Sequence, residues 1–197
     1  MKNSFYSAMW RLLRPLVLLF HPIEVRGREN LTDETVLICA NHSSAWDPIL
    51  MICAFECDFP LRIMAKRQLF KIPLVGGFIR RIGAFPVDRG GSDIGAVKTS
   101  IKSLKDGFNL LIFPEGTRVK KGERVEPKGG AAMIAIRSGV KLLPVFIDTN
   151  KRIFHRVSIV IGAPYAPVYT ERKGTAEEYQ HNADEIMRQV YELGGAQ

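Results

Sequence analysis

The sequence predicts a single α/β domain, a mixed and mostly parallel sheet flanked by helices, preceded by an N-terminal amphipathic helix. Short apolar runs, which are typical of buried strands, alternate with segments of helical character along most of the chain. A length of 197 residues suits one domain with a real hydrophobic core. Neither a repeat nor a low-complexity linker divides the chain. We therefore expect a membrane-associating helix in residues 1–22 and one folded domain in residues 23–197.

The expected elements alternate along the chain. Strands are expected where apolar residues cluster, at residues 23–28, 35–40, 61–65, 84–87, 109–113, 142–147 and 157–161. Helices are expected at residues 48–56, 72–82, 92–105, 129–138 and 176–193. Asp47 and Pro48 favour a helix start, as an N-cap and a first helical residue. Gly76 and Gly77 suggest that the helix at residues 72–82 is short or broken.

The N-terminal segment is rich in apolar and aromatic residues, with Arg11 and Arg14 interspersed. An amphipathic helix lying in the membrane interface fits this pattern, and so does a first helix packed on the domain. The longest charge-free runs are about a dozen residues, whereas a spanning helix needs about 20 apolar ones. Arg14 and Pro15 interrupt the apolar core that a signal peptide would need. We expect peripheral or monotopic attachment to the cytoplasmic face of the cell membrane.

The formal net charge of +8 comes from one part of the chain. Residues 60–130 contain 15 Lys and Arg against 6 Asp and Glu, a surplus of nine, and the rest is nearly balanced. A solvated basic face, an anionic membrane surface and a phosphorylated substrate each fit this surplus. Nucleic acid is the least favoured partner, because zinc-finger spacing, ribonucleoprotein motifs and aromatic residues interleaved with basic ones are all absent.

The cysteines Cys39, Cys53 and Cys57 lie in mostly apolar surroundings. A small, odd number of cysteines favours reduced, buried thiols and a cytosolic compartment. Cys53 and Cys57 are four residues apart, but no second pair of ligands accompanies them, so no metal site is expected.

The first chemical motif is the heptapeptide Asn-His-Ser-Ser-Ala-Trp-Asp at residues 41–47. His42 is the candidate general base, because an imidazole can take a proton from a hydroxyl near neutral pH. Asp47 would orient the ring, as the carboxylate of a catalytic triad does, if a loop turning into a helix brought the two together. The alternative is a histidine bonded to backbone beside a capping aspartate. Ser43 and Ser44 lack a nucleophile elbow, which favours a supporting role.

The second motif is Phe-Pro-Glu-Gly-Thr-Arg at residues 113–118. Gly116 allows a tight turn, and Arg118 offers a planar fork suited to phosphate oxygens. Glu115 is expected to orient that arginine or to contact a hydroxyl of the substrate; a surface salt bridge is the alternative. Lys66 and Arg89 could complete a phosphate cradle with Arg118. Both motifs begin at the carboxyl ends of expected strands, so we expect them to meet.

Four blocks in the same order resemble the PlsC-type glycerolipid acyltransferases, specifically the 1-acylglycerol-3-phosphate acyltransferases. They are residues 41–47, 83–89, 113–118 and 143–147. The resemblance implies transfer of a fatty acyl group from a thioester, acyl-CoA or acyl carrier protein, to lysophosphatidic acid, giving phosphatidic acid. The resemblance implies no cofactor and no metal. Other readings are a different lysolipid acceptor, a thioester or phospholipid hydrolase, and a non-catalytic lipid-binding module.

The resemblance also assigns roles. His42 would deprotonate the acceptor hydroxyl and Asp47 would orient His42. Arg89 and Arg118 would grip the phosphate of the acceptor. Glu115, Gly116 and Thr117 would shape the acceptor site. An anionic membrane surface is the expected place of reaction.

Overall fold

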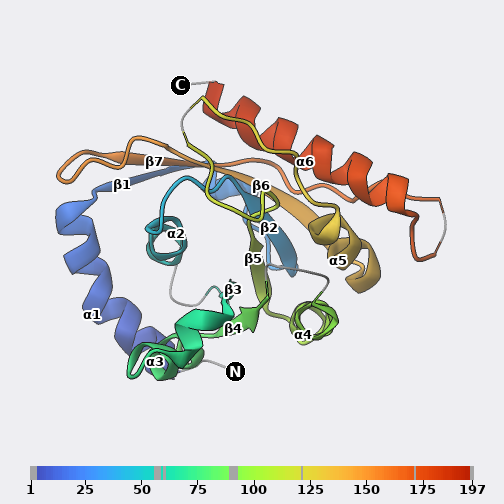
Figure 1. Ribbon diagram of the computed structural model, residues 1–197. Helices are drawn as coiled ribbons and strands as arrows, with labels where there is room; N and C mark the ends of the chain where they lie inside the picture. Colours follow the sequence, from blue (N-terminus) through green and yellow to red (C-terminus); the bar gives the residue numbers. More distant parts are fainter. Residues whose placement is uncertain are drawn as a thin grey trace.

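The computed structural model describes residues 4–55, 59, 61–88, 93–120, 122–170 and 172–195. Within these residues, seven strands form one sheet in the order β1-β7-β6-β2-β5-β3-β4 (Figure 1). The strands are β1 (Ile23–Arg26), β2 (Val36–Ala40), β3 (Leu61–Lys66), β4 (Ala84–Val87), β5 (Asn109–Ile112), β6 (Lys141–Ile147) and β7 (Val157–Ile161). The β6–β7 pair is antiparallel and the other five pairs are parallel. The expected mixed, mostly parallel sheet is confirmed.

Helices cover both faces of the sheet (Figure 1). One face carries α1 (Ser4–Phe20) and α2 (Asp47–Ala54), and the other carries α4 (Ile94–Lys105), α5 (Gly130–Ser138) and α6 (Ala176–Gly195). The short η1 (Arg28–Asn30) follows β1. The helix expected at residues 72–82 is short and unbroken: α3 spans Val75–Arg81, includes both glycines, and follows the separate 3-10 turn η2 (Arg67–Lys71).

The central strand β2 is buried along its whole length. Ile38 belongs to the core layer under α2, and Leu37 belongs to the layer under α5 and α6. Successive side chains of a strand point to opposite faces, so a strand covered on both sides must be apolar throughout. That requirement explains why the run at residues 35–40 shows no polar alternation.

Helix α1 packs one face against the carboxyl end of α2. The Trp10 indole nitrogen donates to the carbonyl oxygens of Ile52 and Phe55, at 3.0 and 3.1 Å. Arg14 donates to the Cys53 carbonyl at 3.1 Å. These contacts satisfy carbonyls that a helix end leaves without partners.

The opposite face of α1 is apolar and exposed at Leu12, Leu16 and Leu19. The helix is therefore both packed on the domain and amphipathic, so the two readings of its sequence are compatible. Within the described part of the chain, every helix is too short or too polar to cross a membrane.

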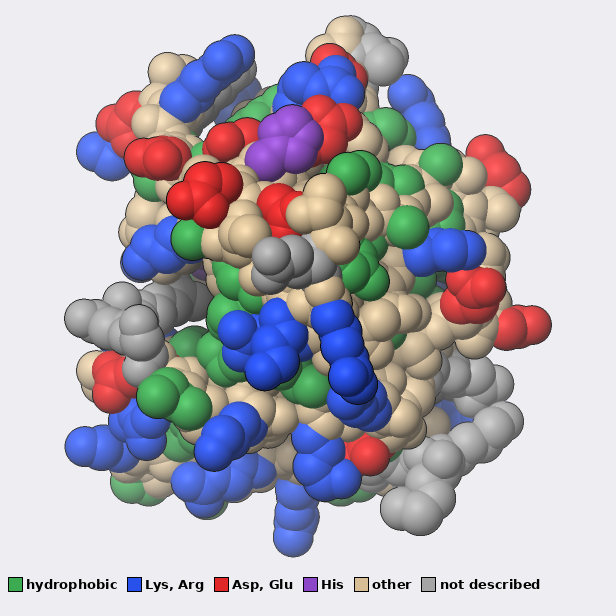
Figure 2. Space-filling model, turned by 90° about the vertical axis from the view of Figure 1, so that its right-hand side faces the viewer, with side chains coloured by type: hydrophobic (Ala, Val, Ile, Leu, Met, Phe, Trp, Pro, Cys, Tyr) green, Lys and Arg blue, Asp and Glu red, His purple; other side chains and the backbone are tan. Residues whose placement is uncertain are grey.

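The basic and acidic side chains separate on the face built by α4, α5 and α6. Figure 2 shows Lys and Arg gathered in its lower half, where α4 lies, and Asp and Glu gathered above them toward α6. Helix α4 contributes Lys98, Lys102 and Lys105 to this surface. Part of the basic surplus at residues 60–130 therefore forms a solvated face.

Two of the cysteines, Cys39 and Cys53, are buried and not disulfide-bonded. Burial raises the pKa of the Cys53 thiol to about 11, so it stays protonated at neutral pH. Cys57 lies outside the described residues.

Candidate active site

The candidate residues gather at one edge of the sheet. Strands β2, β3, β5 and β6 run parallel, so their carboxyl ends meet at that edge. The loops that leave them carry both motifs, because β2 leads into His42 and β5 leads into Glu115. Open α/β sheets bind ligands at this edge. The expectation that the two motifs meet is confirmed by direct hydrogen bonds between them.

His42 and Asp47 form a buried pair. His42 Nδ1 lies 2.9 Å from Asp47 Oδ2, and the Asp47 side chain is fully buried. The same carboxylate oxygen accepts the backbone amides of Ser43 and Ser44 at 2.7 and 2.8 Å. Trp46, one residue earlier, occupies the N-cap position of α2, so the prediction that Asp47 is the N-cap is wrong by one residue. The Asp47 carboxylate therefore binds the backbone of the loop at Ser43 and Ser44 and also orients the imidazole of His42.

Asp47 is ionised at neutral pH. Burial opposes its charged form, but the hydrogen bond from His42, the charge of Lys151 and the Ser44 amide hold the pKa of Asp47 below its ordinary value of 3.8. An ionised carboxylate can only accept, so Nδ1 of His42 carries the proton. Among the described residues, none hydrogen-bonds Nε2 of that ring. The second nitrogen is therefore available to take a proton from a substrate.

The imidazole ring is supported from one side by the aromatic residue that starts the second motif. The rings of His42 and Phe113 are stacked, with centroids 4.2 Å apart and planes inclined by 19°. Together with Asp47, this contact restricts the orientation of the imidazole.

Glu115 joins the two motifs. Its Oε2 accepts the backbone amide of His42 at 2.7 Å, and its Oε1 accepts the hydroxyl of Tyr191 from α6. The amide of Val119 donates to the His42 carbonyl at 2.7 Å. Burial raises the pKa of the Glu115 carboxyl, although the hydrogen bonds from Tyr191 and His42 oppose that shift. Instead of contacting Arg118, Glu115 fixes the backbone of His42.

Asn41 ties the same loop to the neighbouring strand. Its side-chain amide donates to the Ile147 carbonyl at 2.9 Å, and its oxygen accepts the Ile147 amide at 2.7 Å. Asn41 is buried, so these bonds are shielded from water. The loop that carries His42 is thus held by β6 through Asn41 and by the loop after β5 through Glu115.

The remaining predicted site residues lie at the surface of this edge. Gly116 has a φ of +66°, and a Cβ built there would lie 3.2 Å from Cε of Lys128. Thr117 and Arg118 follow it in an exposed turn, and Lys66 is exposed at the end of β3. The predicted phosphate ligand Arg89 lies outside the described residues.

An apolar cavity of about 350 Å³ opens beside the second motif. Phe113, Pro114 and Gly116 form part of its wall, next to the imidazole. Other apolar parts of the wall come from β3, β4, β5, α4 and α5, including Met64, Val87, Val97, Leu111 and Ile134. Three charged residues, Asp88, Asp93 and Lys128, also line the cavity. Its size and composition fit a bound apolar group.

Two residues of the site were not predicted from the sequence. Tyr191 lies in α6, 76 positions after its partner Glu115, and its spacing gives no signal of that contact. Lys151 follows β6, whose carboxyl end lies at the same edge because β6 pairs in parallel with β2. That position was the one available signal, but it does not distinguish a buried lysine from an exposed one.

The comparison with known families decides the assignment of the chain. A model of the family described as Acyltransferase matches residues 22–148. The chain belongs to the acyltransferase family. This acyltransferase family member is 32% identical over 164 residues to the 1-acyl-sn-glycerol-3-phosphate acyltransferase of Bacillus subtilis, a match that covers 81% of each chain.

Other relatives agree. The Streptococcus pneumoniae protein of the same name is 38% identical over 114 residues, which are 57% of this chain and 41% of that one. The crystal structure of PlsC from Thermotoga maritima, a 1-acyl-sn-glycerophosphate (LPA) acyltransferase, superposes with a TM-score of 0.70 at 28% identity. That match covers 98% of this chain and 79% of the other. The resemblance inferred from the sequence and the expected fold are both confirmed.

Proposed function

We propose that this protein is a 1-acylglycerol-3-phosphate acyltransferase. It transfers a fatty acyl group from a thioester of coenzyme A or acyl carrier protein to the free hydroxyl of lysophosphatidic acid, giving phosphatidic acid. The buried pair of His42 and Asp47, joined through Glu115 to the turn that carries Arg118, is the observation that carries this proposal. Family membership and the names of the relatives support it.

In the proposed reaction, His42 is the general base. Its Nδ1 donates to Asp47, so Nε2 accepts the proton of the acceptor hydroxyl while the hydroxyl oxygen attacks the thioester carbonyl. The tetrahedral intermediate collapses as the new C–O bond remains and the C–S bond breaks. The imidazolium then returns its proton to the departing thiolate. Asp47 stabilises the positive ring between these two transfers.

The phosphate of the acceptor is proposed to bind Arg118, with Lys66 nearby at the same sheet edge. Both side chains are exposed and free to meet a soluble headgroup, and Val119 connects Arg118 directly to the His42 backbone. A guanidinium binds phosphate oxygens in a fork. The Arg118→Ala variant should raise the KM for the acceptor more than the KM for the thioester. Lys120→Ala, an exposed cation two residues later, is the matched control, and equal acceptor KM values for the two variants would exclude Arg118 from this role.

The acyl chain of the donor is proposed to enter the cavity beside Phe113. The cavity wall is mostly apolar, and it begins next to the ring that stacks on His42. A chain in this cavity would lie against Phe113, the ring that stacks on His42. Burial of its methylenes would contribute about 0.8 kcal/mol each to binding.

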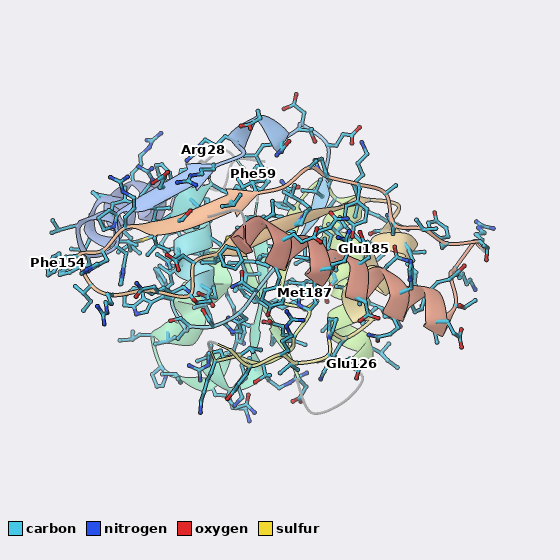
Figure 3. The ribbon with its side chains drawn as sticks, turned by 90° about the horizontal axis from the view of Figure 1, so that it is seen from above. Arg28, Phe59, Glu126, Phe154, Glu185 and Met187 are labelled. Carbon is cyan, nitrogen blue, oxygen red and sulfur yellow. The ribbon has the colours of Figure 1, made fainter. Side chains whose placement is uncertain are left out.

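The membrane surface is proposed to meet the exposed face of α1. Phe20, the last residue of α1, forms a second apolar contact with Phe154, and their ring centroids are 5.6 Å apart. The Phe154 amide also donates to the Phe20 carbonyl at 2.6 Å. Figure 3 shows Phe154 at the edge of the molecule, beside the blue ribbon of α1. Arg11 lies on the same helix, and a cation beside exposed apolar residues suits anionic lipid.

The test of the proposed function is product identification. The purified protein is incubated with labelled acyl-CoA or acyl carrier protein and a panel of lysolipids, and the products are identified by mass spectrometry. Phosphatidic acid formed from lysophosphatidic acid is the expected result. Acylation of a different lysolipid would show that lysophosphatidic acid is not the acceptor. Release of free fatty acid without an acceptor would indicate a hydrolase. No turnover on any thioester would reject the enzyme assignment.

A further inference from the structure

Lys151 is a buried cation at the centre of the site. Its side chain is 5% exposed, and its ammonium lies 2.9 Å from Asp47 Oδ1, the oxygen that His42 does not use. It also donates to the Ser43 hydroxyl at 2.6 Å. Burying an ammonium is costly unless it is paired, so the fold places this lysine here against a desolvation penalty that the carboxylate must offset.

The loop that carries Lys151 is pinned at both ends. Asp148 donates its amide to the Ser158 carbonyl at 2.9 Å, and its side chain accepts the Asn150 amide at 2.8 Å. On the other side, Phe154 bonds to the last residue of α1, Phe20. The ammonium is therefore presented from a fixed backbone, as positioning of a catalytic group requires.

The charges around the imidazole show what Lys151 changes. Two carboxyl groups approach His42, Asp47 through its ring nitrogen and Glu115 through its backbone amide. Tyr191, itself close to Arg124, donates to Glu115. With Lys151 present, the Asp47–Lys151 pair is neutral before proton transfer. Without Lys151, the unpaired carboxylate would hold a proton on His42 more tightly, and a smaller fraction of the protein would have an unprotonated imidazole at a given pH.

We propose that Lys151 is a positioning residue that neutralises Asp47 and keeps His42 unprotonated, so that the imidazole can act as a general base. The proposal rests on the proposed function for its catalytic consequence. The predicted effect of Lys151 on the protonation of His42 is a property of the protein without substrate and does not depend on that function. The contacts through which the lysine acts are those with Asp47 and with the Ser43 hydroxyl.

The direct test is the protonation of His42 in the absence of substrate. The chain has four histidines, so the His42 resonance in a histidine-labelled sample is assigned by comparison with a His42→Gln variant and followed by NMR against pH. In folded Lys151→Met, the pH of half-protonation is expected to rise by about one unit, a tenfold gain in proton affinity. An unchanged or lower midpoint would overturn the proposal, whether or not the protein transfers acyl groups.

The control is Lys141→Met. Lys141 begins the same strand, β6, at its opposite end, and its ammonium pairs with Glu34 at 2.7 Å on the surface. This variant should leave the His42 titration unchanged. If Lys151→Met does not fold, Lys151→Gln keeps an amide donor for Asp47 and Ser43 while it removes the charge. The same upward shift is expected from it, and the absence of that shift refutes the proposal.

The kinetic readout separates a positioning role from a merely structural one. In Lys151→Met, the acidic limb of the kcat/KM profile should move to higher pH, and raising the pH should restore part of the lost rate. Lys151→Arg, which keeps the charge, should retain the position of that limb. A uniform loss at every pH would contradict the proposal while leaving the acyltransferase assignment intact.

Discussion

Glu115 offers the sharpest test of how the two motifs are held together, because a pair of variants separates its hydrogen bonds from its charge. Glu115→Ala leaves the buried amide of His42 without an acceptor, which costs about 1–3 kcal/mol. It also removes one buried methylene, at about 0.8 kcal/mol. The free energy of unfolding should fall by about 2–4 kcal/mol, a large part of the 5–15 kcal/mol typical of a domain.

Glu115→Gln keeps the acceptor for His42, and its amide group can donate to the Tyr191 oxygen. Its unfolding free energy should stay within about 1 kcal/mol of the wild type at neutral pH. Both variants are measured by urea denaturation followed by circular dichroism. Equal midpoints for the Ala variant and the wild type would show that Glu115 does not hold the site together.

The difference in unfolding free energy between Glu115→Gln and the wild type should change with pH in a definite direction. Burial raises the pKa of Glu115 in the folded protein above its ordinary value of 4.5. A raised folded pKa contributes stability below pH 4.5 that is lost as the pH rises through the folded value. The Gln variant cannot titrate, so its stability relative to the wild type should rise from pH 4.5 toward neutrality. A difference that does not change with pH would contradict the burial argument.

Three further predictions concern the loop, the cavity and the membrane face. Asn41→Asp should lower the unfolding free energy by about 2–4 kcal/mol, because a carboxylate there would face the Ile147 carbonyl without a proton to donate. A denaturation midpoint like that of the wild type would contradict this prediction. Gly130→Leu should lower kcat/KM for long-chain thioesters more than for short ones. Gly130 lines the cavity, and a Cβ added there meets nothing within 4 Å, so the leucine would fill space that a long chain needs. Equal losses for both chain lengths would show that the acyl chain does not occupy the cavity. Replacing Leu12 and Leu16 with Ser should weaken sedimentation with phosphatidylglycerol vesicles while folding persists, since both side chains are exposed, and unchanged sedimentation would argue against this face.

The expected elements were recovered because each depends on local pattern. The buried run of β2 and the helix start beside Pro48 follow from periodicity and backbone chemistry that can be read within a few residues. The meeting of the two motifs followed from a rule about strand ends, which needs no contact information.

The partners within the site could not be predicted in the same way. Glu115 was expected to work with Arg118, its neighbour in sequence, but its actual partners are His42 and Tyr191, 73 and 76 positions away. Lys151 contacts Ser43 across 108 positions. Contacts of this range depend on how loops cross the sheet edge, and a single sequence records no trace of that geometry. A charged residue such as Lys151 is expected at the surface from its sequence alone. Once it is buried, it must pair with another group, and it can then position that group.

The roles assigned to the phosphate-binding residues remain predictions. Lys66 and Arg118 lie at the expected edge of the sheet, and their exposure suits a ligand that arrives from solution or from a membrane. Substrate contact is a property of the complex, so neither the sequence nor the folded chain alone determines it.

Replacement of His42 tests the central claim most directly. His42→Gln keeps a polar side chain of similar length beside Asp47 but removes the nitrogen that accepts the proton. The account predicts a folded protein with an unchanged circular dichroism spectrum that forms phosphatidic acid from lysophosphatidic acid and acyl thioester at least 10³-fold more slowly than the wild type, by mass spectrometry. Turnover near the wild-type rate by that folded variant would contradict the account.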